Sequence, residues 1–211
     1  MIMADVRSWH KEVIPEATER ALEAFSKAGL GAFYLAGGTG LALRFGHRLS
    51  RDLDFFCAQP FDENAIIDEL KGTGKISVIS KARETLHLHI SGVKVSLLGY
   101  HYPVLFPFDR FMSVQVADPR DIACMKINAI AGRGSRRDFI DLYVIAQEYG
   151  LALLLDLFQK KYAEIDFNRV HALKSLTYFK DAENEPMLKM LEPTSWDQVF
   201  DFFRKEAPKL L

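Results

Sequence analysis

The chain has 211 residues, of which 49% are hydrophobic and 26% are charged, so it is long and apolar enough to bury a substantial core. Its formal net charge of −1 excludes a global basic field for nucleic acid, so RNA binding would have to use a local cluster such as Arg133, Arg136 and Arg137. The start of the chain lacks the apolar centre of a signal peptide, and no apolar run approaches about 18 residues. These features predict a cytoplasmic protein without a membrane span, and two cysteines without metal spacing favour a reducing compartment.

Apolar spacing in the first half of the chain alternates between helical and strand periods. The predicted elements, in chain order, are a helix over 14–28, a strand over 33–36, a helical run over 40–46, a strand over 52–56 and a helix over 62–70. Three runs of period two then cover 75–82, 85–90 and 93–100, with a hairpin turn at Ser91 and Gly92. This order predicts a small mixed sheet with helices packed on it.

From Pro119 onward the apolar spacing is helical. Asp118 is a helix cap before Pro119, and Ser135 caps the helix after that. The expected helices cover 119–132, 135–147, 151–162, 167–179 and 195–207. We therefore expect an α/β (α+β) fold, with a core over residues 1–117 and a C-terminal helical bundle over 118–211 that packs on this core.

A glycine turn separates the 33–36 strand from the helix after it. Gly37 and Gly38 end the strand, and Thr39 begins the helical run. Glycines let a phosphate approach the main chain, and the free N–H groups of a helix start favour its negative charge. The Thr39 hydroxyl adds a donor. Gly-Gly-Thr by itself is more often an ordinary turn with a helix cap.

The next predicted strand carries two carboxylates. Its period of two places Asp52 and Asp54 on one face and the apolar Leu53 and Phe55 on the other. Mg²⁺ takes carboxylate oxygens together with substrate phosphates, as phosphoryl and nucleotidyl transfer require. An Asp-x-Asp pair alone is commonly a solvated strand face. When the pair follows a glycine turn in the sequence, however, it indicates a nucleotide-phosphate and metal site. Two anions on one strand face are destabilising unless a cation neutralises them.

Residues 35–56, with the sequence LAGGTGLALRFGHRLSRDLDFF, resemble the signature of nucleotidyltransferase-like proteins of the AbiEii/AbiGii toxin family, within the DNA polymerase beta superfamily. That signature runs Gly-Gly-Thr/Ser, a short helix, Arg-x-Ser and Asp-x-Asp-Phe. The residues that match its second half are Arg48, Ser50, Asp52, Asp54 and Phe55. A second block over 117–143 resembles the later Lys and Arg-Asp-x-x-Asp-Leu motifs of the family, through Lys126, Asp138 and Asp141.

The resemblance implies transfer of a nucleoside monophosphate from an NTP to an acceptor hydroxyl, with Mg²⁺ or Mn²⁺ as cofactor. The implied metal ligands are Asp52 and Asp54, which are also counted as catalytic with Lys126, Asp138 and Asp141. The implied nucleotide-binding residues are Gly37, Gly38, Thr39, Arg48, Ser50 and Lys126. The resemblance further implies a toxin-like role in phage defence, an RNA or tRNA end or a protein as acceptor, and an antitoxin from a neighbouring gene.

The residues of the second block also have purely structural interpretations. Spacing alone favours Lys126 as a lysine that lies along an apolar stripe and holds its amine in water. Asp138 and Asp141 share one helix face, and Arg137 is a possible ion-pair partner for Asp141. Such pairs on helix surfaces are common and weak. The resemblance is what favours functional roles, without deciding between the two aspartates.

One position departs from the family's pattern. Polymerase-beta-type transferases generally have a third carboxylate on a later strand, where alternation here places Ser96. Either Asp138 or Asp141 substitutes for it, or the chain is a nucleotide-binding regulatory or interaction module with reduced catalysis. A kinase-like transfer that releases ADP is a third hypothesis. His87 and His89 share a strand face, but such a pair without a third ligand is more often structural.

Overall fold

The structure is a computed structural model, and it describes residues 8–164 and 168–211. The sequence-based expectation about the first residues therefore falls mostly outside the described part, as does residue 167 of the expected 167–179 helix. The strands are β1 Tyr34–Leu35, β2 Leu53–Cys57, β3 Ile76–Ala82, β4 Thr85–Ile90, β5 Val93–Gly99, β6 Asp109–Phe111 and β7 Val114–Val116. The helices are η1 Lys11–Val13, α1 Glu16–Lys27, α2 Gly37–Phe45, α3 Glu63–Lys71, α4 Pro119–Arg133, α5 Arg136–Tyr149, α6 Leu151–Lys161, α7 Arg169–Ser175, α8 Lys180–Glu183, α9 Trp196–Glu206 and η2 Ala207–Leu210.

The seven strands form one mixed sheet in the order β3-β4-β5-β2-β1-β7-β6. Strands β3, β4 and β5 are an antiparallel meander, β2 is parallel to β5, and β1 is antiparallel to β2 and parallel to β7. The turn between β4 and β5 is the expected one, because Ser91 and Gly92 both have positive φ, 51° and 86°. The α/β (α+β) class and the mixed sheet are thus confirmed.

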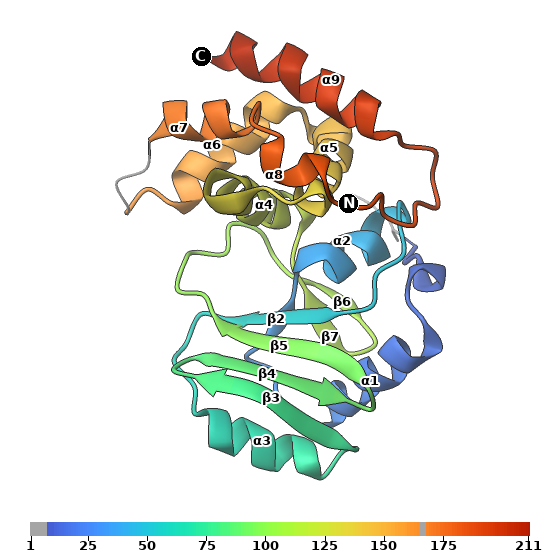
Figure 1. The fold of residues 1–211 in the computed structure, drawn as a ribbon. Helices are drawn as coiled ribbons and strands as arrows, with labels where there is room; N and C mark the ends of the chain where they lie inside the picture. The colour runs from blue at the N-terminus through green and yellow to red at the C-terminus, as the bar shows by residue number, and fades with distance from the viewer. Residues whose placement is uncertain (1–7, 165–167) are drawn as a thin grey trace, which may run out of the picture.

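Helices cover the two faces of the sheet separately (Figure 1). Helices α1 and α3 pack on one face, where the Phe25 ring stacks on Phe55 with centroids 3.7 Å apart. On the other side, α2 lies between the sheet and helices α4 to α9, and apolar residues of both parts form a second core. That core includes Tyr34 of β1 and Leu41 of α2 together with residues from α4 onward. The helical part therefore packs directly on the half of the chain that carries the sheet.

The N-terminal ends of several helices are capped by side chains, including the expected cap Asp118 of α4. The Asp62 carboxylate accepts hydrogen bonds from the first turn of α3, and the Asp118 carboxylate accepts one from Arg120 N–H in α4. Ser195 caps α9 in a capping box with Gln198. The division at residue 117 stays a prediction, although β7 ends at Val116 and α4 begins at Pro119.

The structure differs from the expected elements in four places. Helix α2 begins at Gly37 instead of residue 40, so the glycine turn is the first turn of the helix, and β2 begins one residue after Asp52. The 167–179 region forms the shorter α7 and is followed by a separate helix, α8. Hairpin β6–β7 was not predicted, because two strands of three residues are too short to show a period of two.

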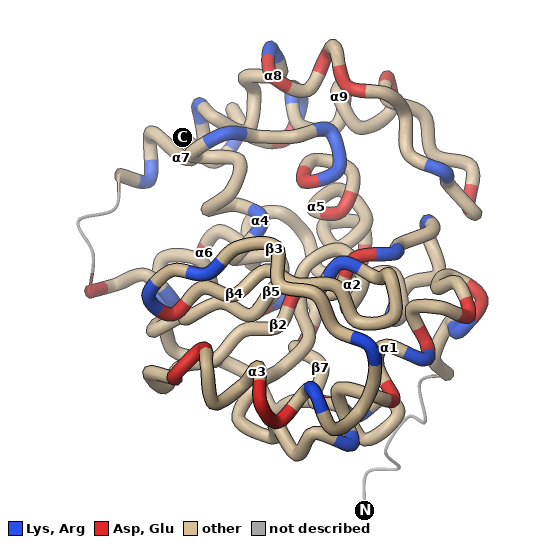
Figure 2. Tube along the Cα trace, turned by 60° about the horizontal axis from the view of Figure 1, so that its bottom comes forward, with Lys and Arg blue, Asp and Glu red and all other residues tan. Residues whose placement is uncertain are grey.

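Charged residues of both signs are interspersed along the chain in Figure 2, in keeping with the net charge of −1. None of the helices in residues 8–164 and 168–211 is long and apolar enough to span a membrane. Both cysteines are buried and unpaired, and burial raises the pKa of the Cys124 thiol to about 12. Cys124 is therefore a core residue and not a reactive thiol.

Candidate nucleotide-binding site

One cavity of about 420 Å³ brings together the two sequence blocks that resemble the family motifs. Its walls come from the start of α2, the segment that leads into β2, and helices α4 and α5. A fourth wall is the segment before α9, which contributes Leu188 and Lys189. This volume lies within the range of about 300 to 1,000 Å³ that is typical of small-molecule sites. Most of the residues predicted from sequence line it.

Asp52 and Asp54 line the cavity with free carboxylates. Neither side chain is engaged in a hydrogen bond or an ion pair with the described residues, although both main-chain carbonyls are used. A Cβ at Gly37 would come within 3.1 Å of Asp54 Oδ2, so the absence of a side chain at Gly37 leaves this carboxylate accessible. The glycine turn and the carboxylate pair are therefore in direct proximity, as the sequence predicts.

The donor set suits a hard divalent cation that shares its ligands with a substrate. The described residues contain no group of three or more His, Cys, Asp or Glu side chains that could hold a metal alone. Mg²⁺ is usually bound through one or two carboxylates plus substrate phosphates. Two free carboxylates beside a glycine turn at a helix start fit that mode of binding and do not fit a metal site made of protein ligands only.

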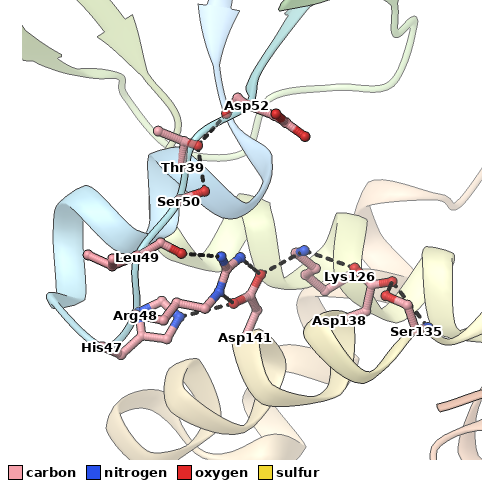
Figure 3. Close-up of polar contacts among 10 residues, drawn as sticks. All are labelled: Thr39, His47, Arg48, Leu49, Ser50, Asp52, Lys126, Ser135, Asp138 and Asp141. Atoms are coloured by element: carbon pink, nitrogen blue, oxygen red, sulfur yellow. Dashed lines mark hydrogen bonds and ion pairs between the residues drawn. The ribbon is translucent and has the colours of Figure 1, made fainter. Parts of the chain in front are cut away.

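Thr39 and Ser50 hold the approach to β2 in place. The Thr39 hydroxyl donates to the main-chain carbonyl of Asp52, and its oxygen lies 2.7 Å from the Ser50 hydroxyl (Figure 3). Because this hydrogen atom is already used, Ser50 is the donor in the second bond. Thr39 is only 2% exposed. Both hydroxyls thus fix the position of Asp52, which differs from the expectation that Thr39 donates to a phosphate.

The guanidinium of Arg48 is buried between the two halves of the chain. Its Nε donates to Asp141 Oδ1 at 2.7 Å, its Nη2 to Asp141 Oδ2 at 2.9 Å, and its Nη1 to the Leu49 carbonyl at 3.1 Å. This bidentate pair joins the segment after α2 to helix α5 (Figure 3). The side chain also lies against Gly38, where a Cβ would overlap Nη2. Gly38 is required by this packing independently of any phosphate.

Asp141 is the centre of a buried charge cluster. It accepts hydrogen bonds from His47 Nε2 at 3.0 Å and from Arg48, and Lys126 Nζ lies 2.8 Å from its Oδ2. Burial by itself would raise the pKa of Asp141, but the charges of Lys126 and Arg48 hold it well below its usual range. With no exposed surface, Asp141 does not reach the cavity. The possible ion pair with Arg137 does not form among the described residues, where Arg137 lines the cavity instead.

Lys126 lies between the two aspartates of α5. Its amine is 2.9 Å from Asp138 Oδ1 and 2.8 Å from Asp141 Oδ2 (Figure 3). Burial would lower the pKa of Lys126, but the two carboxylates raise it, so the amine stays charged. Asp138 also accepts a hydrogen bond from the Ser135 hydroxyl at 2.6 Å, at the start of α5. Lys126 and Asp138 both line the cavity, so Lys126 is not a lysine with its amine free in water.

Ser96 lies beside Asp54 in the sheet. The two residues are direct partners across the parallel pair β2 and β5, and Ser96 is in turn paired with His87 of β4. Paired residues project from the same face of a sheet, so Ser96 projects from the face that carries the Asp54 carboxylate. On β5 the position beside Asp54 therefore holds a hydroxyl. His89 faces Lys94, and neither histidine lines the cavity.

The sequence analysis did not assign several of the residues that line the cavity to this site. Three exposed cations, Arg51, Arg137 and Lys189, line it, and their side chains make no hydrogen bond or ion pair with the rest of the described chain. Leu49 and Leu188 are the apolar side chains of its lining. Arg137 belongs to the second motif block. Leu188 and Lys189 lie in a region without any recognisable motif, and nothing in the sequence indicated that this region returns to the site.

Comparison with known proteins identifies the family of the chain. The family described as nucleotidyl transferase AbiEii toxin, of a type IV toxin–antitoxin system, matches residues 20–87 and 92–209. A protein of Aquifex aeolicus without an assigned function is 39% identical over 185 residues, which cover 85% of this chain and 88% of that protein.

Two solved structures share the fold at low sequence identity. The nucleotidyltransferase toxin MenT4 of Mycobacterium tuberculosis has a TM-score of 0.59 and 16% identity, over 93% of this chain and 85% of that one. A protein of Helicobacter pylori described as a candidate nucleotidyltransferase has a TM-score of 0.56 and 17% identity, over 92% of this chain and 94% of that one. With the family match over most of its length, the chain belongs to the AbiEii family of nucleotidyl transferase toxins.

Proposed function

We propose that this protein transfers a nucleoside monophosphate from an NTP to an acceptor hydroxyl and releases pyrophosphate. The observation that carries the proposal is one cavity in which the glycine turn, the free carboxylates of Asp52 and Asp54, and the Lys126–Asp138 pair meet. Membership of a nucleotidyl transferase family supports the same reaction class.

Asp52 and Asp54 hold Mg²⁺ or Mn²⁺ in this proposal. The metal supplies charge neutralisation and alignment of the phosphates. Gly37 and Gly38 let the phosphates approach the main-chain N–H groups at the start of α2, where the helix dipole favours negative charge. Lys126 adds a fixed positive charge at the opposite wall.

Asp138 takes the place of the missing strand carboxylate, because it lines the cavity and Asp141 does not. The proton of the acceptor hydroxyl passes to the Asp138 carboxylate while the acceptor oxygen forms a bond to the α-phosphorus. The bond between that phosphorus and the oxygen leading to the β-phosphate breaks, and pyrophosphate leaves. Arg48, Thr39, Ser50 and Asp141 are positioning residues in this proposal, since their hydrogen bonds fix Asp52 and join the segment before β2 to α5.

The acceptor in this proposal is an RNA or tRNA end or a protein hydroxyl. We further propose that the protein acts in the cytoplasm as a toxin in phage defence, with an antitoxin encoded by a neighbouring gene. The type IV toxin–antitoxin description of the family supports this biological role.

A second candidate function is a nucleotide-binding regulatory or interaction module with little or no turnover. Ser96 is the observation in its favour, because a hydroxyl stands beside Asp54 where a carboxylate is expected. A kinase-like transfer, which would use the same phosphate turn, is distinguished by its product: it releases ADP instead of pyrophosphate.

A labelled-NTP transfer assay separates these functions. Each of the four NTPs, labelled in the α-phosphate, is incubated with the protein, Mg²⁺ and either total RNA or total protein. Nucleotidyl transfer gives a labelled acceptor and pyrophosphate, and the Asp52→Asn/Asp54→Asn variant abolishes both. NTP binding without a labelled acceptor supports the binding module, whereas transfer of label only from γ-labelled ATP supports the kinase-like reaction.

A further inference from the structure

The segment 188–192, which we call the strap, is fixed to the chain that precedes β2. Leu49 N–H donates to the Lys189 carbonyl at 3.0 Å, and Leu191 N–H donates to the His47 carbonyl at 2.9 Å. Between these bonds, Arg48 and Met190 form an antiparallel bridge. Main-chain bonds on both sides therefore set the position of the strap, and they do so beside the arginine that anchors the site.

The strap brings a free positive charge to the cavity. Lys189 lines the cavity, is exposed, and makes no side-chain hydrogen bond or ion pair with the described residues. Lys126 differs in this respect, because Asp138 and Asp141 both neutralise its amine. The charge of Lys189 is thus available to a ligand.

The paired cations of the site supply too little positive charge for a triphosphate. Apart from the free cations Arg51, Arg137 and Lys189, the site and its buried cluster contain four carboxylates, Asp52, Asp54, Asp138 and Asp141, and two arginine or lysine side chains, Arg48 and Lys126. Both of these cations are paired with aspartates. A divalent metal offsets the two free carboxylates but leaves most of the charge of the phosphates unbalanced. The free cations Arg51, Arg137 and Lys189 have to supply the rest.

We propose that Lys189 binds the phosphates of the nucleotide and that the strap is part of the nucleotide site. The inference rests on the proposed function and adds a ligand from the segment between α8 and α9. A lysine amine acts on phosphate as a compact point charge, which arginine replaces better than a neutral residue does. Because Lys189 is exposed, its contribution falls as salt increases.

Binding calorimetry with the full chain tests this role. The four NTPs are compared in Mg²⁺, and the NTP that binds most tightly is used with its diphosphate, monophosphate and nucleoside. Lys189→Ala weakens NTP binding about tenfold at low salt, which corresponds to about 1.4 kcal/mol. Lys189→Arg retains most of the affinity, and Lys189→Glu loses more than the alanine variant. The loss decreases from the triphosphate to the monophosphate and is absent for the nucleoside.

Lys180→Ala is the matched control, because Lys180 is an exposed lysine at the start of α8 that does not line the cavity. Leu191→Pro removes the N–H that bonds to His47 and tests the strap itself. In that background, adding Lys189→Ala costs less NTP affinity than it does in the parent. Melting temperatures show whether each variant is folded, and the Lys189 variants decide the question if Leu191→Pro is not folded.

The outcomes separate this inference from the proposed function. If Lys189→Ala binds the NTP as tightly as Lys180→Ala does, or if it weakens nucleoside and NTP equally, the inference is wrong. The proposed function then stands as long as Asp52→Asn/Asp54→Asn removes the Mg²⁺-dependent binding. If NTP binding does not depend on these two aspartates, the proposed function fails whatever Lys189 does.

Discussion

The guanidinium of Arg48 fills the space that a side chain at Gly38 would occupy. A Cβ at Gly38 would overlap Nη2 of Arg48 and lie 3.3 Å from its Cζ. The arginine has little freedom to move away, because two of its nitrogens are bonded to Asp141. The glycine of the proposed phosphate-binding turn is therefore also a packing requirement of the buried charge cluster.

Replacement of Gly38 by alanine is expected to destabilise the fold. The added methyl group forces Arg48 away from Asp141, and overpacking of this kind costs about 1 to 3 kcal/mol. Chemical denaturation measures the free energy of unfolding. Gly132→Ala is the control, since this glycine lies in α4 with no atom near its Cβ position, and alanine there is neutral or stabilising by up to about 1 kcal/mol. Equal stability of Gly38→Ala and the parent would contradict the packing argument.

The second prediction concerns Asp141→Asn. The substitution leaves Arg48 and Lys126 buried with one carboxylate fewer, and loss of one partner in such a cluster costs about 3 to 5 kcal/mol. Asp68→Asn is the control, because Asp68 forms an exposed pair with Lys71 and contributes little. Comparable unfolding free energies for the two variants would mean that the buried cluster does not hold the halves together.

The same cluster makes stability depend on pH. The folded pKa of Asp141 is held below its unfolded value by Lys126 and Arg48, despite burial. Its contribution is fully present above the unfolded pKa, about 3.9, and is lost as the pH falls through the folded pKa. Denaturation curves recorded from pH 6 downward are expected to show a steeper loss of stability for the parent than for Asp141→Asn. Parallel curves would show that Asp141 is not the titrating group.

Local signals in the sequence were sufficient for most of the fold. The Asp62 and Asp118 caps, the Ser91-Gly92 turn and the two-residue alternation of β4 and β5 each depend on residues close together in the chain. Hairpin β6–β7 was missed because each strand has only three residues, although it pairs with β1 and completes the sheet.

The site was predictable in its composition and less so in the roles of its residues. Motif spacing identified Asp52 and Asp54, the family resemblance added Lys126, and the cavity contains all three. The spacing did not show that the Thr39 hydroxyl is used by a main-chain carbonyl or that Arg48 faces Asp141, because these contacts join residues from different elements. The sequence did not predict the position of the strap. Main-chain hydrogen bonds to residues 47–49 hold it in place, and such bonds do not require a particular side chain.

A fourth prediction assigns turnover to Asp138. Asp138→Asn is expected to lower kcat by about 10² to 10⁴, the usual contribution of a general base, with little change in NTP affinity. Asp138 also accepts a hydrogen bond from Ser135, so Ser135→Ala is the control that removes this contact and keeps the carboxylate. Transfer assays and NTP calorimetry on both variants separate the roles. An Asp138→Asn variant that turns over like Ser135→Ala would exclude Asp138 as the base.

The last prediction restores a carboxylate on β5. Ser96 and Asp54 are direct neighbours across parallel strands, so Ser96→Asp brings a second negative charge next to Asp54. Without a divalent metal the two like charges repel, and the melting temperature falls below that of the isosteric Ser96→Asn. Mg²⁺ relieves the repulsion, and it therefore raises the melting temperature of Ser96→Asp more than that of Ser96→Asn or the parent.

Activity gives Ser96→Asp its second readout. If the parent is a binding module because it lacks this carboxylate, Ser96→Asp creates or raises pyrophosphate release when an acceptor is present. If Asp138 already acts as the base, Ser96→Asp leaves the rate of the parent nearly unchanged. The same substitution restores turnover to Asp138→Asn, because either carboxylate can accept the proton of the acceptor hydroxyl. A Mg²⁺ response identical to that of Ser96→Asn, with no gain of activity in the parent or in Asp138→Asn, would show that position 96 does not face the metal that Asp52 and Asp54 are proposed to hold.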